Sequence, residues 1–174
     1  MTDVSIELLG EHHAEAILRV AIDPELSWTS SVPAACDATH VAAWIAENGA
    51  SPKTGLTFAI IYRGAVAGAV TLKRLDAADN SGELAFWVGR AHRGKGLARK
   101  AAELAIDYAF DRLGLDYLHA HCLRDNNPAS RKTLEALGLS LDASCHDMPV
   151  EGRFKQRFDG DAWVFYRRDR VIPR

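Results

Sequence analysis

The feature that most constrains this chain is a predicted strand that leads through a glycine-rich basic turn directly into a long predicted helix. Residues 83–88 have the composition of a strand, and residues 96–113 carry apolar side chains at helical spacing. Between them, Gly94 and Gly96 let the backbone adopt conformations closed to other residues and approach a ligand closely. The first amides of the helix lack intrahelical partners and lie at the positive end of its dipole. Such a turn is suited to hold phosphate, although on the glycines alone an exposed basic turn is an equally good interpretation.

Three basic residues, Arg93, Lys95 and Arg99, add positive charge beside this turn. Two familiar phosphate motifs are nevertheless absent. The order Gly-x-x-x-x-Gly-Lys-Ser/Thr of the P-loop does not occur, and Gly94-x-Gly96 is followed by Arg99 where the dinucleotide fingerprint has its third glycine. The pattern therefore excludes those two classes of nucleotide site.

The remaining pattern predicts one α+β domain over residues 1–174. Ahead of the turn we predict strands over residues 4–9, 56–62 and 65–75, and helices over residues 11–22 and 37–47. Asp37 is the expected N-cap of the second helix, Arg63-Gly64 the hairpin turn, and residues 23–37 a connecting segment with room for a turn of helix. After the long helix we predict a strand over residues 115–123, a helix from Asn127-Pro128 to Leu137-Gly138, and a strand over residues 162–167.

Composition and charge narrow the class of protein. The chain is 48% hydrophobic and 25% charged with a formal net charge of -2, so no basic field suggests a nucleic-acid or membrane partner. Three widely spaced cysteines predict reduced thiols rather than a disulfide framework or a zinc site. No signal peptide is recognisable, and no apolar run approaches the roughly 20 residues of a membrane span. We therefore predict a cytoplasmic protein that needs no metal.

Two segments together resemble the GNAT acetyltransferases. Arg93-x-x-Gly96-x-Ala98 is similar to the Arg/Gln-x-x-Gly-x-Gly/Ala signature of that superfamily. The segment from Asn127 to Gly138, with Ser130 in its first turn, is similar to the Asn-x-x-Ser…Leu-Glu-Lys-Leu-Gly-Phe segment of the RimJ/RimL type. The two stand at the family's usual separation, and the predicted strand order agrees along nearly the whole chain.

The resemblance implies a mixed, mostly antiparallel sheet of about seven strands, flanked by helices, in which the strand over residues 83–88 splays from its neighbour at a bulge. It also implies acetyl-CoA as co-substrate, with the pantetheine arm on the strand over residues 83–88 and the pyrophosphate on the glycine-rich turn. The cofactor-binding residues would be Phe86, Trp87, Val88, Arg93, Gly94, Lys95, Gly96, Leu97, Ala98, Arg99 and Asn127. The acceptor would be an amine, either a protein N-terminus or a small molecule, and homodimers occur among such proteins.

The resemblance makes Ser130 the best single catalytic candidate. A hydroxyl in the first turn of a helix can donate a proton to a departing thiolate that the dipole also favours. A serine that only begins a helix is the structural alternative. An N–H at Val88 would stabilise the oxyanion of the reaction.

The general base is left open. Many members of the family place a tyrosine acid where this chain has Leu134, and some place a glutamate base where it has Cys122. Glu83 is a candidate because it begins the strand beside the expected cleft, and a salt-bridging role is its alternative. His119 and His121 share one strand face, and His146 neighbours an aspartate; each is a candidate base or a hydrogen-bonding residue. These departures keep a second function in view, a non-catalytic module that binds acyl-CoA as a sensor.

The aromatic residues have different expected places. We predict that Trp28, in a connecting segment, lines an acceptor pocket, and that Trp44 packs in the core. Trp87 and Trp163 lie in predicted strands and are interpreted as packing residues. Residues 153–158 alternate basic and aromatic side chains, which we interpret as a strand with a solvated face rather than as a single-stranded nucleic-acid site.

Overall fold

A nine-stranded mixed sheet forms the centre of the described part of the computed structural model, which covers residues 3–30, 32, 37–51 and 55–171. Its main path has the order β1-β3-β4-β5-β6-β9-β7, and the short strands β2 and β8 pair with β3 and β9. The strands are β1 (Val4–Leu8), β2 (Ala50–Ser51), β3 (Gly55–Tyr62), β4 (Ala65–Asp76), β5 (Ser81–Val88), β6 (Tyr117–Leu123), β7 (Ser140–Leu141), β8 (Met148–Pro149) and β9 (Ala162–Asp169). Every pairing except β5–β6 is antiparallel, which confirms the predicted fold class.

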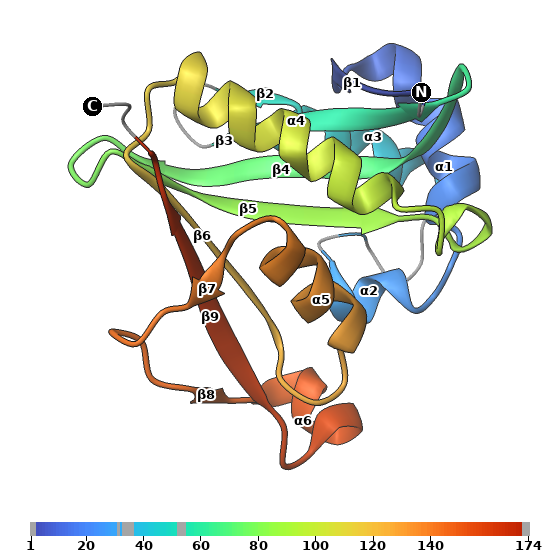
Figure 1. Cartoon of the computed structure of the whole chain (residues 1–174). Helices are drawn as coiled ribbons and strands as arrows, with labels where there is room; N and C mark the ends of the chain where they lie inside the picture. Colours follow the sequence, from blue (N-terminus) through green and yellow to red (C-terminus); the bar gives the residue numbers. More distant parts are fainter. Residues whose placement is uncertain (1–2, 31, 33–36, 52–54, 172–174) are drawn as a thin grey trace.

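The sheet divides between β5 and β6. These strands pair only where Ser81, Gly82 and Glu83 meet Tyr117, Leu118 and His119. Beyond that point β5 stays paired with β4 and β6 stays paired with β9, so the two halves of the sheet diverge (Figure 1). The expected splay is therefore present. The expected bulge lies elsewhere: the β4–β5 register runs unbroken along the diverging stretch and shifts only at the closed end, between Lys73 and Asp76.

Helices cover both faces of the larger half-sheet. On one face α4 (Leu97–Asp111) packs its alanine-rich side against Phe58, Ile60 and Leu72 in a common core. On the other face, α1 (Ala14–Ala21) and α3 (Ala38–Asn48) bury their apolar sides against the small side chains of Ala59 and Ala69. Adjacent strand residues supply the two cores because their side chains alternate between faces. Within the described residues, no helix is long and apolar enough to cross a membrane.

Two local predictions are confirmed by backbone geometry. Arg63 and Gly64 both have positive φ (52° and 76°), as a two-residue hairpin turn of the favoured twist requires. The carboxylate of Asp37 accepts a hydrogen bond from the His40 amide at 2.9 Å and so caps α3. The helix expected over residues 11–22 begins as a 3-10 turn over Glu11–His13 before α1.

Residues 153–158 are helical, so the predicted strand is wrong. They belong to α6 (Gly152–Phe158), which begins at a glycine with φ of 56°. Phe154 and Phe158 stand four residues apart, and both meet the Trp28 ring edge-on, at 6.0 and 6.1 Å between centroids. Helical spacing lets both phenylalanines reach the Trp28 ring. This tertiary contact outweighs the alternation of basic and aromatic residues from which the strand was predicted.

The buried carboxylate of Asp161 fixes the loop that leads into α5 (Pro128–Ala136). One oxygen accepts from the amides of Asp125 (3.0 Å) and Ala162 (2.7 Å), and the other from the amide and side chain of Asn126 (3.0 and 2.8 Å). Asn127, the next residue, is the N-cap of α5. The start of β9 thus determines where α5 begins.

We predict that Asp161→Ala lowers the free energy of unfolding by roughly 2–3 kcal/mol, because charged hydrogen bonds are lost and buried amides are left unpaired. Burial alone would raise the pKa of Asp161, but the hydrogen bonds from Asn126, Ala162 and Asp125 outweigh it and hold the pKa below its ordinary 3.8. A lowered carboxyl pKa stabilises the folded state above that ordinary value, and the contribution is lost as the pH falls through the folded-state pKa.

Urea denaturation at pH 7 and at decreasing pH values below 3.8 measures this effect. The difference between wild type and variant should shrink as the carboxyl is protonated. The exposed Asp159→Ala serves as the matched control and should leave the stability unchanged. Equal stability of the Asp161 variant at pH 7 would contradict the assignment.

Candidate active site

The glycine-rich turn between β5 and α4 presents open backbone. It runs through a 3-10 turn over Arg90–His92 to Gly94 and Gly96, whose φ values are 75° and 72°. A Cβ added at either glycine would meet no protein atom within 4 Å. Gly96 is the N-cap of α4, so the first amides of this 15-residue helix, which lack intrahelical partners, lie at the turn. The turn therefore has open positions, left-handed backbone and a helix start, which are the features that the predicted phosphate site needs.

A cavity of about 490 Å³ lies against this turn. Most of the residues predicted to bind the cofactor line it: Phe86, Trp87, Val88, Arg93, Gly94, Gly96, Leu97, Ala98, Arg99 and Asn127. Beyond Glu83, the edge of β5 that faces β6 pairs with no strand in the part of the chain that the structure describes, so it can pair with an extended ligand. Lys95 is the exception among the predicted residues. Its ammonium group donates to the Ala91 carbonyl at 3.0 Å and lies 5.8 Å from the Tyr62 ring, outside this cavity.

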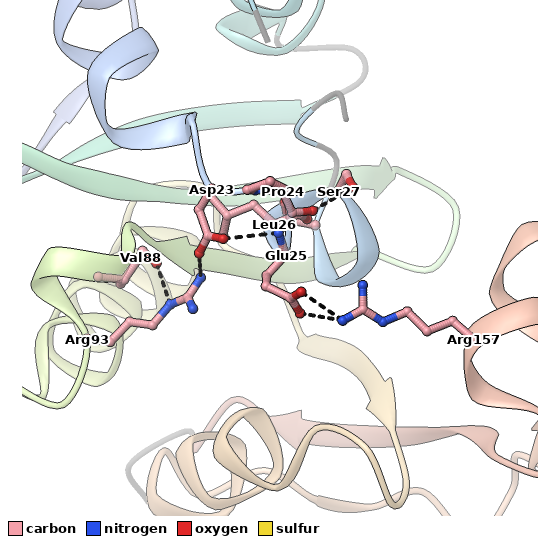
Figure 2. Close-up of polar contacts among 9 residues, drawn as sticks. Asp23, Pro24, Glu25, Leu26, Ser27, Val88, Arg93 and Arg157 are labelled. Atoms are coloured by element: carbon pink, nitrogen blue, oxygen red, sulfur yellow. Dashed lines mark hydrogen bonds and ion pairs between the residues drawn. The ribbon is translucent and has the colours of Figure 1, made fainter. Parts of the chain in front are cut away.

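The side chain of Arg93 is engaged with protein atoms. Its Nε donates to the Val88 carbonyl at 3.1 Å, and a terminal nitrogen donates to the buried Asp23 carboxylate at 2.7 Å (Figure 2). Asp23 also accepts from the Glu25 amide at 3.1 Å. The guanidinium group therefore fastens the end of β5 to the segment that precedes α2 (Leu26–Thr29). Local sequence patterns could not predict this contact, because Asp23 and Arg93 are 70 positions apart.

A second cavity of about 310 Å³ occupies the space where β5 and β6 diverge. It shares Phe86, Trp87, Asn127 and Ser130 with the first cavity. Asn127 accepts from the Ser130 amide at 3.2 Å and so caps α5. Within the described residues the Ser130 hydroxyl has no hydrogen-bond partner, and it stands where the two cavities adjoin.

Glu83 lies at the closed end of the split and is 1% exposed. Lys73 Nζ is 3.0 Å from one carboxylate oxygen and an Arg74 nitrogen is 2.9 Å from the other. His121 Nδ1 and His119 Nε2 lie 3.3 and 3.8 Å from the carboxylate. Burial lowers the pKa of both histidines, and the charge of Glu83 opposes this shift only in part. Burial therefore favours the neutral form of both imidazoles.

Among the candidate bases, Glu83 and His121 line the second cavity. His119 and His146 do not, and His146 is exposed. Cys122 lines the cavity as well, but burial raises the pKa of its thiol to about 11, so it is neither a base nor a nucleophile at neutral pH. Cys36 lies outside the described residues.

The tryptophans fall in different places. Trp28 lines the second cavity as predicted, from α2 rather than from a loop. Trp44 is buried and its ring centroid lies 6.3 Å from that of Trp87, which lines both cavities. Trp163 also lines the second cavity, so its interpretation as a packing residue was incomplete. Strand periodicity predicts only that Trp163 lies on one face of β9. That face borders a cavity because β6, which pairs with β9, separates from β5 at this level of the sheet.

Comparison with known proteins identifies the family. Residues 4–140 match the family described as "Acetyltransferase (GNAT) domain". The chain is 26% identical over 117 residues to "Putative ribosomal N-acetyltransferase YdaF" of Bacillus subtilis, an alignment that covers 62% of this chain and 63% of that protein. The chain spans less than two thirds of the length of this and the other curated relatives it matches.

Solved structures agree in fold. Spermidine N-acetyltransferase from Vibrio cholerae, in complex with CoA and spermine, superposes with a TM-score of 0.78 at 16% identity, covering 96% of this chain and 95% of that one. RimL, the ribosomal L7/L12 alpha-N-protein acetyltransferase, in complex with coenzyme A, superposes with a TM-score of 0.79 at 15% identity, covering 97% and 95%. With the divided sheet, the glycine-rich turn and the matching family model, the chain belongs to the GNAT acetyltransferase family.

Proposed function

We propose that this protein transfers an acetyl group from acetyl-CoA to a primary amine. The observation that carries the proposal is the pair of adjoining cavities in the divided sheet. One lies against an amide cradle suited to a diphosphate, the other is open to a second substrate, and Ser130 belongs to both. The V. cholerae relative in fold holds CoA and a polyamine in one complex, which supports a two-substrate site.

The donor fits the first cavity by its chemistry. The open positions at Gly94 and Gly96 admit phosphate to the start of α4, where the helix dipole favours negative charge. Arg99, which also lines the cavity, adds a positive side chain. The unpaired edge of β5 offers backbone hydrogen bonds to the amide groups of a pantetheine arm.

The acceptor is an ammonium ion at neutral pH, so it first loses a proton to become a nucleophile. Its nitrogen then bonds to the carbonyl carbon of the thioester as the carbon–sulfur bond breaks; the nitrogen loses a second proton and the sulfur gains one. We assign removal of the ammonium proton to His121, whose neutral form burial favours and which lines the second cavity, and the second nitrogen proton passes to water. We assign the proton that the sulfur gains to the hydroxyl of Ser130, at the start of α5.

Glu83 is also predicted as catalytic, and we assign it the role of orienting and stabilising His121. Both of its oxygens already face cations, Lys73 and Arg74, so accepting a proton would weaken two ion pairs. At 3.3 Å from His121 Nδ1, its charge orients the imidazole and stabilises it once protonated.

The acceptor cavity is bridged by side chains, which favours a small amine. Residues of α2 and α6 meet across the split: Trp28 packs on Phe154 and Phe158, and Glu25 pairs with Arg157 at 2.6 Å. The segment from Asn127 to Gly138 and the similarity to RimL support the RimJ/RimL type. Homodimer formation and a cytoplasmic location stay predictions from the sequence.

The alternative function, a non-catalytic acyl-CoA sensor, has one observation in its favour. The positions where many relatives carry an acid and a base hold Leu134 and Cys122 here, and both are buried in the cavity wall. Release of free thiol from acetyl-CoA in the presence of an amine panel separates an enzyme from a sensor.

We predict that Gly94→Ala weakens acetyl-CoA binding by about tenfold or more, because a methyl group in the cradle obstructs the approach of phosphate. Isothermal titration calorimetry measures the change. Gly114→Ala is the matched control, since Gly114 also has positive φ (69°) and open space around it but lies at the far end of α4. Both variants should lose similar stability, about 1–2 kcal/mol. Equal affinities in the two variants would refute the cradle.

We predict that Ser130→Ala lowers kcat by about 100-fold while the Kd for acetyl-CoA stays unchanged, because a general acid is lost without a binding contact. The rate of thiol release from acetyl-CoA gives kcat, and isothermal titration calorimetry gives the Kd for acetyl-CoA. Ser140→Ala, on the exposed strand β7, is the control. Near-wild-type turnover at unchanged affinity would remove Ser130 from the mechanism.

We predict that His121→Gln slows acetylation at pH 7 by about 100-fold and that the loss largely disappears near pH 10, where an amine of pKa about 10.4 deprotonates itself. The lowered pKa of His121 means that the wild-type imidazole is an effective base above its folded-state pKa, and base catalysis fades below it. A pH–rate profile tests this, with His119→Gln as control. A loss that is the same at all pH values would indicate a structural role instead.

A further inference from the structure

Three aromatic rings form one wall of the second cavity. Trp28 comes from α2, Phe154 from α6 and Trp163 from β9. The Phe154 ring lies edge-on to both tryptophans, at 6.0 Å from Trp28 and 5.3 Å from Trp163, with interplanar angles of 81° and 78°. All three are half-buried and line the cavity, so they leave ring surface available to a ligand.

Two guanidinium groups hold the outer end of this wall. The Arg153 and Arg157 carbons lie 5.6 and 5.1 Å from the centre of the Trp28 ring. Arg153 donates to the Ser27 carbonyl at 2.8 Å. Arg157 pairs with Glu25, as Figure 2 shows. Cations of the protein thus already occupy the position beside Trp28 that an extended cationic ligand would need.

The cavity offers little negative charge to a polycation. Among the residues described in the structure, the charged ones that line it are Lys73 and Glu83. Lys73 at 3.0 Å and Arg74 at 2.9 Å pair with the Glu83 carboxylate. A polyamine carries several ammonium groups, and each needs a carboxylate or an equivalent partner when it leaves water.

We propose that the acceptor is a primary amine with a single positive charge and a flat aromatic body, and that the wall of Trp28, Phe154 and Trp163 selects it over polyamines. This inference rests on the proposed acetyl transfer. A cavity of about 310 Å³ is at the small end for ligand sites, which fits a ring on a short alkyl arm. Ring-to-ring contacts supply the selectivity, and the amine reaches the thioester between His121 and Ser130.

The test measures kcat/KM for acetylation of four acceptors: 2-phenylethylamine, tryptamine, spermidine and n-butylamine. We expect the two aromatic amines to exceed both spermidine and n-butylamine by at least about tenfold. Trp163→Leu and Phe154→Leu should raise KM for tryptamine and lower the ratio of kcat/KM for tryptamine to kcat/KM for n-butylamine by about tenfold; the ratio removes any effect of Trp163 on the neighbouring His121, 5.3 Å away between ring centroids. Tyr117→Leu, which removes a ring from β6 outside the cavity, is the matched control.

A charge variant tests the second half of the proposal. Lys73→Gln removes one partner of Glu83 and should raise kcat/KM for spermidine relative to tryptamine. Calorimetric binding of N-acetyltryptamine and N1-acetylspermidine to wild type and to the leucine variants gives a readout that does not need turnover. We expect only the aromatic product to bind, and its affinity to depend on Trp163 and Phe154.

The outcomes separate this inference from the proposed function. Turnover that prefers spermidine, or that ignores the leucine substitutions, overturns the aromatic acceptor and leaves acetyl transfer intact. Absence of turnover with every amine, together with loss of acetyl-CoA binding, overturns the proposed function. Selective, ring-dependent binding of N-acetyltryptamine supports the inference even in a variant with impaired chemistry.

Discussion

The carboxylate of Glu83 joins three strands at the point where the sheet divides. Glu83 belongs to β5 and is the last of its residues in register with β6, opposite His119. Its charge is taken up by Lys73 and Arg74 on β4, and His121 on β6 approaches it from the other side. A buried carboxylate costs several kcal/mol unless it is paired, so this set of contacts holds the three strands together where backbone pairing stops.

Two adjacent residues reach the same carboxylate because β4 is irregular there. In a regular strand, Lys73 and Arg74 would point to opposite faces of the sheet. Arg74 instead has a left-handed conformation with φ of 49°, and the β4–β5 register shifts between Lys73 and Asp76. Left-handed backbone is costly for a residue with a side chain, and in this conformation Arg74 comes within 2.9 Å of the second oxygen of Glu83. The irregularity in β4 therefore brings a second cation to Glu83, and it lies outside the stretch where β5 and β6 separate.

Side chains from distant segments complete the site on both sides of the split. Asp23 meets Arg93 at the glycine-rich turn, and Glu25, two residues later, meets Arg157 on α6 (Figure 2). The short segment ahead of α2 is thereby in contact with the donor side and the acceptor side at once. Asp161 likewise fixes a distant element: its hydrogen bonds position the loop that ends at Asn127, where α5 begins. The catalytic candidates lie on elements whose positions these polar contacts set.

Much of the donor side was predictable because its information is local. Glycines at 94 and 96, followed by helical periodicity, specify a turn and a helix start, and the proposed phosphate site consists of this backbone. The hairpin at Arg63-Gly64 and the cap at Asp37 were predictable for the same reason, since each depends on residues within one turn. Lys95 shows the limit: the turn was located correctly, but a Tyr62 ring and the Ala91 carbonyl direct its side chain elsewhere.

The acceptor side was not predictable from the sequence, because its parts come together only in the tertiary structure. The aromatic wall takes one ring each from segments around residues 28, 154 and 163, and helical spacing in α6 becomes evident only through its contact with Trp28. The neutral state of His121 likewise depends on burial and on cations from another strand. The sequence by itself determined where the open glycine-rich turn and the start of the long helix lie, since local conformation decides that. Only the tertiary structure decided which side chains line the second cavity, because that depends on where β5 and β6 cease to pair.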